Sequence, residues 1–178
     1  MAALDASRLG PLVTTTSGPT WCHAPADEPF DLEALARPGD GDDRWSDGAR
    51  PTAYLAGDRL TAVAEYVRHA RAGGSRLARD IVQLELRPTR VLDFRRDDVR
   101  EALGPRSAPS ACLDRSIAQD LGRDVRGLGL VEGIVVPSMA FLDQPDRYNV
   151  VLFVEALAGG IASALASPVV VGSIRLEP

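Results

Sequence analysis

The sequence contains no lysine. All 20 of its basic residues are arginine, so no catalytic Schiff base on a lysine amine can form. Arginine stays charged at physiological pH, and its planar fork pairs with carboxylates and phosphates through two hydrogen bonds. Acidic residues outnumber the arginines, and the formal net charge is −5. A chain with this charge has no general attraction to nucleic acid or to an anionic membrane.

Cysteine is also scarce. Cys22 and Cys112 are far apart in the sequence and lack the spacing of a zinc site. Without a disulfide framework, a reducing compartment is the simpler inference. The N-terminus has no basic start followed by an apolar run, as a secretory leader would have. The longest apolar region, residues 150–171, is interrupted by Glu155 and Pro168, which argues against a membrane span. We therefore expect a cytoplasmic protein.

Several common catalytic motifs are missing. No phosphate loop and no glycine-rich dinucleotide loop opens a helix, and no G-x-S-x-G nucleophile elbow occurs. Gly127-Leu-Gly129 follows a predicted helix and so lacks the context of a nucleotide loop. His23 and His69 need distant carboxylates to build a metal site, and the acidic run at 40–43 lacks calcium-loop spacing. No metal and no bound cofactor are predicted.

The remaining sequence indicates one α+β domain over residues 1–178, which is long enough for a single core. Residues 1–10 are predicted to form a loose arm, and residues 24–48 a long loop. The predicted strands are 12–16 and 20–23 around a turn at 17–19, then 52–56, 81–86, 90–94, 133–136, 149–156 and 169–176. The predicted helices are 32–36, a helix between the N-cap Asp58 and the glycines at 73 and 74, 96–103 and 114–126.

Apolar periodicity predicts which faces of the two longer helices are buried. In the helix after Asp58 the predicted core stripe is Leu60, Val63, Ala64 and Val67. In the helix at 114–126 it is Leu113, Ile117, Leu121 and Val125. The strand at 169–176 is apolar enough to lie either in the core or in an interface between chains, so a homo-oligomer is possible from the sequence.

The rest of the chain is organised around residues 44–65. This stretch brings together Arg44 from a loop, Tyr54 from a strand and Glu65 from a helix. Such a set suits a ligand with a phosphate, a flat ring and a bond that breaks with positive charge. The same residues could instead be a surface arginine, a core tyrosine and a solvated glutamate. Arg50 is an alternative to Arg44 in the same loop.

Short motifs in this stretch and further along resemble the RES-domain family, which is named for an arginine, a glutamate and a serine. The matching segments are Arg44-Trp45-Ser46, residues 51–56 (PTAYLA), 62–65 (AVAE), 131–138 (VEGIVVPS) and 149–153 (NVVLF). A predicted helix at 116–126 also lies where the family has one. The resemblance covers roughly residues 20–156, with the motifs in the right order.

This resemblance implies a fold like that of ADP-ribosyltransferase toxins, with a mixed β core and a few flanking helices. It also implies that NAD is the substrate. Family members are typically toxins of toxin–antitoxin modules and are neutralised by an Xre-like DNA-binding antitoxin. They degrade cellular NAD, in some cases by phosphorolysis, and others have been linked to protein ADP-ribosylation. A non-catalytic module that binds NAD or ADP-ribose remains an alternative for this chain.

The resemblance and the chemistry of NAD together assign roles to single residues. Arg44 is predicted to bind phosphate, Tyr54 to stack on the nicotinamide ring, and Glu65 to stabilise the ribosyl cation or to bind its hydroxyls. Ser138 is predicted to form hydrogen bonds at the wall of the site. The family usually has an additional arginine on its first strand, but residues 20–24 contain none. His23 is the residue of that strand predicted to contribute a hydrogen bond.

Overall fold

The computed structural model describes residues 4–36, 43–46, 48, 50–72, 77–144 and 146–176. Its strands are β1 (Thr14–Pro25), β2 (Thr52–Ala56), β3 (Arg79–Asp93), β4 (Gly133–Pro137), β5 (Tyr148–Phe153) and β6 (Leu165–Ile174). Its α-helices are α1 (Ala6–Leu9), α2 (Arg59–Arg71), α3 (Asp97–Leu103), α4 (Arg115–Gly127) and α5 (Ile161–Ala164). Its 3₁₀ helices are η1 (Gly10–Leu12), η2 (Leu32–Ala36), η3 (Pro105–Ser107), η4 (Ala111–Leu113) and η5 (Val154–Ala156).

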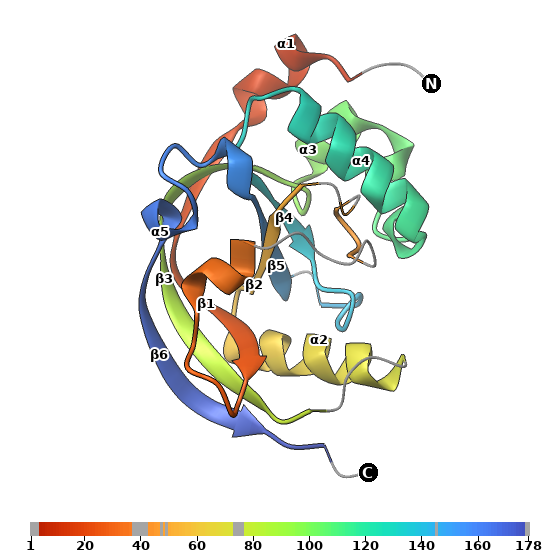
Figure 1. The fold of residues 1–178 in the computed structure, drawn as a ribbon. Coiled ribbons are helices and arrows are strands. Elements are labelled where there is room, and N and C mark those ends of the chain that lie inside the picture. The colour runs from red at the N-terminus through yellow and green to blue at the C-terminus, as the bar shows by residue number, and fades with distance from the viewer. Residues whose placement is uncertain are drawn as a thin grey trace.

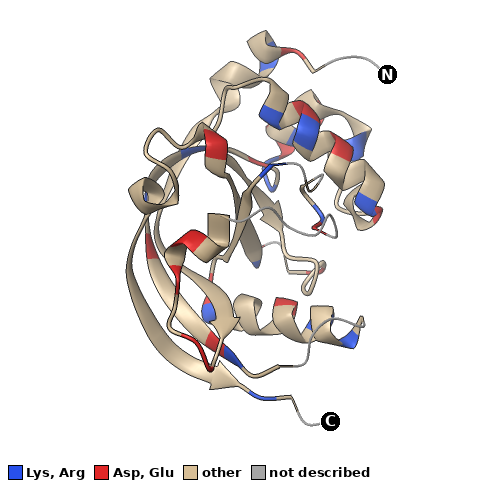
Figure 2. Ribbon diagram, viewed as in Figure 1, with Lys and Arg blue, Asp and Glu red and all other residues tan. Residues whose placement is uncertain are grey.

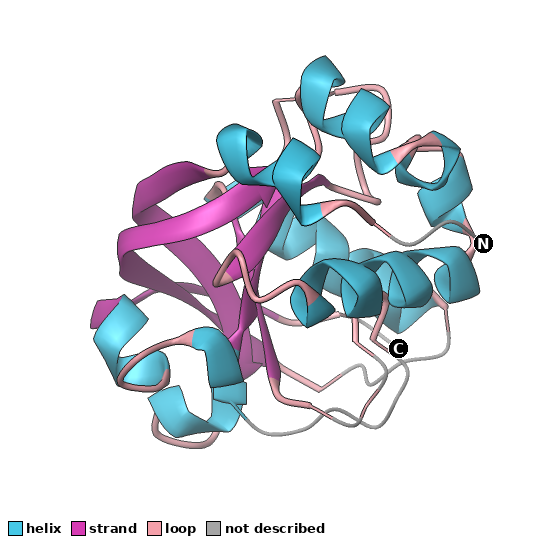
Figure 3. Cartoon of the chain, turned by 90° about the horizontal axis from the view of Figure 1, so that it is seen from above, coloured by secondary structure: helices cyan, strands magenta, loops and turns pink. Residues whose placement is uncertain are grey.

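The strands form one sheet whose order is β1-β2-β5-β4-β3-β6. A further pairing between β1 and β3 closes the first five strands into a ring and leaves β6 outside it, against β3. β3 and β4 are parallel, and the other pairings of these strands are antiparallel. The long strands curve along one side of the molecule, while α2, α3 and α4 lie on the other (Figure 1; Figure 3). The predicted mixture of strands and helices in one fold is confirmed.

Both faces of the central strands β4 and β5 are buried. Along β5, Val151 and Phe153 contact one core cluster, which includes residues of α1, α3 and α4, and Val150 and Leu152 contact the other, which includes residues of α5. Alternate side chains of a strand point to opposite faces. Two buried faces explain why the sequence of these strands is continuously apolar.

The first strand is longer than predicted. The sequence predicted two strands around a turn at residues 17–19, but β1 is continuous. The pairing with β3 shifts register between Thr16 and Gly18, where β3 has one residue more than β1, and Gly18 has a φ of 112°, which favours glycine. The turn prediction was wrong because a glycine at an irregular point of a strand ladder looks the same in the sequence as the glycine of a turn.

The third strand also merges two predicted strands. Pro88 was expected to end a strand at residue 86, but β3 runs through it to Asp93. Arg87 and Pro88 together face the single residue between Thr16 and Gly18 of β1, beyond the paired part of β6 and before the first β4 pair at Val91. No ladder hydrogen bond is required of a proline at such a position, so the strand continues.

The buried face of α2 differs from the predicted one. Leu60 is 51% exposed, and the buried residues of α2 are Thr61, Ala62, Tyr66 and Ala70. The apolar pattern failed here because a threonine, two alanines and a tyrosine are buried instead of the predicted residues. The Tyr66 hydroxyl donates to the carbonyl of Leu77 at 2.5 Å, which meets its polar requirement. The predicted helix stop at 73–74 and the acidic run at 40–42 lie outside the described residues.

In α4 the predicted stripe is only partly buried. Leu121 and Val125 lie in the core as expected, but Leu113 precedes the helix and is 51% exposed. The chain start is also more ordered than the predicted loose arm. Asp5 caps α1, and Leu9 is fully buried. Two strand boundaries near the C-terminus shift, because residues 154–156 form η5 and β6 begins at Leu165.

Candidate active site

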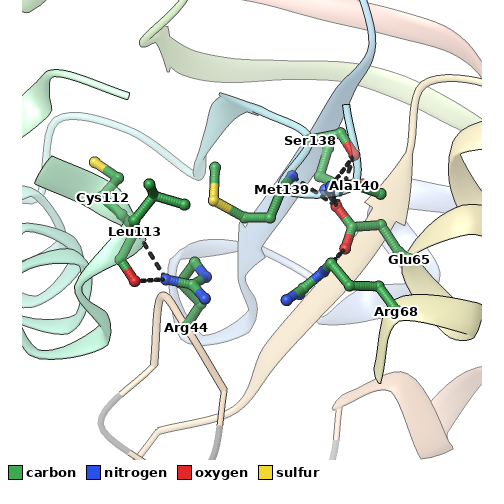
Figure 4. Close-up of polar contacts among 9 residues, drawn as sticks. Arg44, Glu65, Arg68, Cys112, Leu113, Ser138, Met139 and Ala140 are labelled. Carbon is green, nitrogen blue, oxygen red and sulfur yellow. Dashed lines mark hydrogen bonds and ion pairs between the residues drawn. The ribbon is translucent and has the colours of Figure 1, made fainter. Parts of the chain in front are cut away.

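Glu65 is the centre of a hydrogen-bond network between α2 and the loop after β4 (Figure 4). Its Oε1 accepts from the Ser138 hydroxyl at 2.7 Å, from the Met139 amide at 2.9 Å and from Asn149 Nδ2 at 3.0 Å, with the Ala140 amide at 3.4 Å. Its Oε2 accepts from Arg68 Nε at 3.0 Å. The carboxylate is therefore held in one orientation.

This network keeps Glu65 ionised. Burial alone would raise the pKa of its carboxyl group, but the hydrogen bond from Ser138 and the charge of Arg68 outweigh burial and lower the pKa below its usual value. Ser138 is fully buried, so its hydroxyl is committed to this contact. The network leaves the carboxylate anionic at neutral pH.

The N-terminal end of α2 fixes where Glu65 lies. Asp58 caps the helix by accepting from the Thr61 amide at 3.0 Å, and it also accepts from Arg147 Nη1 at 2.6 Å. Arg147 follows the loop that begins at Ser138, and the Ser138 amide donates to the Arg147 carbonyl at 2.9 Å. The same loop is therefore tied to the start of α2 and to Glu65 in its second turn.

Arg44 lies across from Glu65, against η4. Its Nη1 donates to the carbonyls of Cys112 and Leu113, at 2.7 and 2.9 Å. Its Nε is buried and has no hydrogen-bond partner among the described residues. Burial, followed by the nearby charge of Arg68, lowers the pKa of Arg44 from its usual value. Arg44 is thus a partly buried cation with an unused donor.

The loop that carries Arg44 is fastened to α4 on one side. The side-chain amide of Gln119 donates to the Asp43 carbonyl at 2.9 Å. Trp45 is buried and packs edge-on against Phe94, with ring centroids 5.6 Å apart. The backbone of α4 can approach the loop because residue 122 is glycine, where a Cβ atom would stand 2.7 Å from the Trp45 carbonyl oxygen.

Tyr54 fastens the same loop from the sheet. Its hydroxyl accepts from the Trp45 amide at 2.9 Å, and its ring packs against the core cluster on the α4 side. Burial raises the pKa of the Tyr54 hydroxyl above its usual value, so it stays protonated. The Tyr54 hydroxyl thus has a hydrogen-bond partner, as in a core tyrosine. The predicted stacking of its ring on nicotinamide stays a prediction. Arg50, the alternative to Arg44, points to Glu155 at 3.8 Å.

His23 lies apart from these residues. It is on β1, where its ring centroid is 5.2 Å from that of Tyr66. Its Nδ1 is buried and has no hydrogen-bond partner in the described part of the chain, and burial lowers its pKa to about 4, with a smaller effect from Arg79. Within the described part of the chain, no hydrogen bond joins His23 to Arg44, Glu65 or Ser138.

The structure adds three residues that the sequence analysis did not single out. Arg68 holds Glu65 Oε2, Asn149 holds Oε1 from β5, and Met139 donates its backbone amide. The position of Arg68, three residues after Glu65 on a helix, is a spacing at which side chains meet, and it could have been found. The Asn149 contact joins elements distant in sequence, so periodicity gave no signal for it.

Other kinds of site find little support in the described residues. They contain no group of three or more histidine, cysteine, aspartate or glutamate side chains that could hold a metal ion. Within the same residues, no helix is long and apolar enough to cross a membrane. Two hollows lie elsewhere on the surface. One of about 510 Å³ is lined by Asp143, Gln144, Asp146 and Arg147, and one of about 400 Å³ lies between α3 and η3.

The fold and the site together define a class of protein: a mixed α/β domain with a closed ring of strands and a site built from an arginine, a glutamate and a serine. A family model described as "RES domain" matches residues 15–169, and the chain belongs to this family. The predicted family resemblance is thereby confirmed. No curated protein matches the chain in sequence.

A solved structure has a similar fold. It is a chain in the crystal structure of the M. tuberculosis MbcT–MbcA toxin–antitoxin complex. The two chains are 20% identical, with a TM-score of 0.67, and the match covers 98% of this chain and 94% of that one. At this identity the likeness concerns the fold.

Proposed function

We propose that this protein cleaves the bond between nicotinamide and ribose in NAD. The observation that carries the proposal is the Glu65 carboxylate, which four donors hold through one oxygen while the other bonds only to Arg68 in the described part of the chain. Membership of the RES domain family supports it further. A fixed, ionised carboxylate is what a reaction with an oxocarbenium-like transition state requires.

In this proposal the residues of the site divide the work. Arg44 binds a phosphate oxygen through its unused donors, and the Tyr54 ring stacks on the nicotinamide. When the bond between C1′ and the ring nitrogen breaks, its electron pair leaves with nicotinamide, which becomes neutral. Glu65 stabilises the positive charge that develops on the ribosyl group. Water, phosphate or a nucleophile on a protein then donates an electron pair to C1′ and completes the transfer, and a proton carried by that nucleophile is released to solvent.

We propose the biological role of a toxin with an antitoxin partner. The structural neighbour belongs to a toxin–antitoxin complex, and this suggests that a cognate, Xre-like antitoxin neutralises the protein in the cytoplasm. We further propose that the fold is related to that of ADP-ribosyltransferases, as the family resemblance implies. NAD then acts as a substrate, and no bound cofactor is needed.

The test is NAD consumption by the purified protein, with nicotinamide release measured in the presence and absence of phosphate. Glu65→Gln should lower the rate by a factor of about 100 or more, since a preorganised group aimed at developing charge has an effect of this size. Glu101→Gln, on the exposed face of α3, is the matched control and should keep full activity.

Circular dichroism of both variants shows whether the fold is retained. If the wild-type protein consumes no NAD in either condition, with or without an added protein acceptor, it is not an NAD-cleaving enzyme. Binding of NAD without turnover would then indicate a non-catalytic module. Full activity of Glu65→Gln would remove Glu65 from the mechanism.

A further inference from the structure

Two arginines face each other in the site. Figure 4 shows the guanidinium group of Arg68, from α2, directed toward that of Arg44, from the loop before β2, with the Met139 side chain beside the gap. The two are close enough that the charge of Arg68 lowers the pKa of Arg44. Like charges repel, so this arrangement has an energetic cost in the absence of an anion.

Glu65 does not balance both charges. Arg68 donates only its Nε to Glu65, and within the described residues Arg68 has no other carboxylate partner and Arg44 has none. The contacts of Arg44 are to neutral carbonyls, and its Nε is unused. Several N–H donors thus remain around one gap. Planar guanidinium forks match the oxygens of phosphates, and two of them suit a diphosphate.

We propose that Arg68 is a second phosphate-binding residue, which releases Glu65 when the substrate binds and joins Arg44 on the diphosphate of a dinucleotide. This inference rests on the proposed function, because it places a dinucleotide in the same site. The side chain of Arg68 is 43% exposed, so it is free to move, whereas that of Glu65 is only 19% exposed.

The movement of Arg68 from Glu65 to the diphosphate also frees one oxygen of the Glu65 carboxylate. Oε1 keeps its four donors from Ser138, Met139, Ala140 and Asn149, so the orientation of Glu65 does not depend on Arg68. Loss of the Arg68 bond frees Oε2 for the ribosyl group. Binding of the phosphates is therefore coupled to exposure of the carboxylate oxygen that acts in the reaction, and Arg68 is a residue that contacts substrate.

The test measures binding and turnover in Arg68→Ala, Arg68→Lys and the matched control Arg71→Ala, which removes an exposed arginine at the end of the same helix. Calorimetry with ADP-ribose and with inorganic pyrophosphate should show at least about tenfold weaker binding for Arg68→Ala. Adenosine, which has no phosphate, should bind all of these proteins equally. The KM for NAD should rise more than kcat falls.

Arg68→Lys should recover part of the affinity, since it keeps the charge but not the fork. Unchanged binding of pyrophosphate and ADP-ribose in Arg68→Ala would overturn the inference, as would a fall in kcat at constant KM, which is the result for a residue that only orients Glu65. The proposed function can fail separately. If the wild-type protein binds pyrophosphate through Arg68 but does not cleave NAD, the two arginines bind phosphate and the proposed enzymatic activity is wrong.

Discussion

The polar residues of the site are shared between two tasks, holding the site together and facing its ligand. Ser138 and Asn149 hold one oxygen of Glu65, while Arg44 is held through Nη1 and its Nε has no partner among the described residues. A hydrogen bond to a charged group contributes about 1.5–3 kcal/mol to stability, so these contacts fix the site before a substrate arrives. The site is therefore preorganised.

Variants of Tyr54 distinguish the structural role of its hydroxyl from the role of its ring in facing the ligand. Tyr54→Phe keeps the ring but removes the hydroxyl that accepts from the Trp45 amide. A buried N–H without a partner costs about 1–3 kcal/mol, so we expect the free energy of unfolding in urea to fall by this amount. We also expect NAD turnover to fall, because the loop that carries Arg44 loses its attachment to β2.

The contrasting variant is Tyr54→Leu, which removes the ring as well. If the ring alone matters, Tyr54→Phe should retain wild-type stability and turnover, and only Tyr54→Leu should lose them. Wild-type stability of Tyr54→Phe would show that the contact between Tyr54 and Trp45 contributes nothing to the loop.

Sequence motifs identified the residues Arg44, Tyr54, Glu65 and Ser138 but not their contacts. Each was found because it stands in a motif with a defined place on a loop, strand or helix. The donors that complete the site come from β5 and from the loop after β4, far from Glu65 in sequence. Only the fold brings them together, and His23, which was also predicted, points to Tyr66 instead.

At the scale of elements, α4 and the loop that carries Arg44 contact each other through their backbones. Gly122 is where this contact is tightest, because a Cβ atom there would lie 2.7 Å from the Trp45 carbonyl oxygen. The neighbouring atom is backbone, and it cannot move without displacing Arg44. The distance from α4 to the site is therefore set by the absence of a side chain at one position.

Gly122→Ala should push the loop away from α4. We expect the free energy of unfolding to fall by about 1–3 kcal/mol, the usual effect of overpacking, and NAD turnover to fall with it. Gly127→Ala is the matched control on the same helix, since a Cβ atom there has open space. It should be neutral or stabilising by up to about 1 kcal/mol, because glycine is unfavourable in helices. Equal stabilities of the two variants would contradict the close approach.

The lengths of the elements were predicted less well than their positions. Gly18 and Pro88 usually break strands, but both lie at the register shift between β1 and β3, and neither ends its strand. In α2 the buried side chains are small or aromatic, and the larger aliphatic ones are more exposed. Local sequence patterns do not show where these strands end or which face of α2 is buried, because both depend on which elements pack together in the fold.

At the scale of the whole molecule, closure of the strand ring leaves one uncharged edge. β6 carries no charged residue (Figure 2), and Val169 and Val170 are 55% and 54% exposed. The sequence could not decide between core and an interface between chains for this strand, since buried and exposed valines look the same. The ring order, in which β1 pairs with both β2 and β3, was equally hidden from it.

The stability of the whole molecule should depend on pH through two groups that act in different ranges. The pKa of His23 falls from 6.5 to about 4 on folding, chiefly through burial of the imidazole. Between these values the unfolded chain binds a proton that the folded chain does not, so stability decreases as the pH falls through this range. Glu65 has a lowered pKa, and its contribution is present above its unfolded value of 4.5 and is lost as the pH falls below that.

Urea unfolding of wild type, His23→Gln and Glu65→Gln at about pH 7.5 and about pH 5 separates the two groups. The wild-type protein should lose up to roughly 2 kcal/mol more than His23→Gln between these conditions, since each pH unit inside the range corresponds to about 1.4 kcal/mol. The difference in unfolding free energy between wild type and Glu65→Gln should stay nearly constant, because both pH values lie above the range in which Glu65 titrates. Equal decreases in the unfolding free energy of wild type and His23→Gln between the two pH values would mean that water reaches Nδ1 in the folded protein. Burial would then not hold His23 neutral.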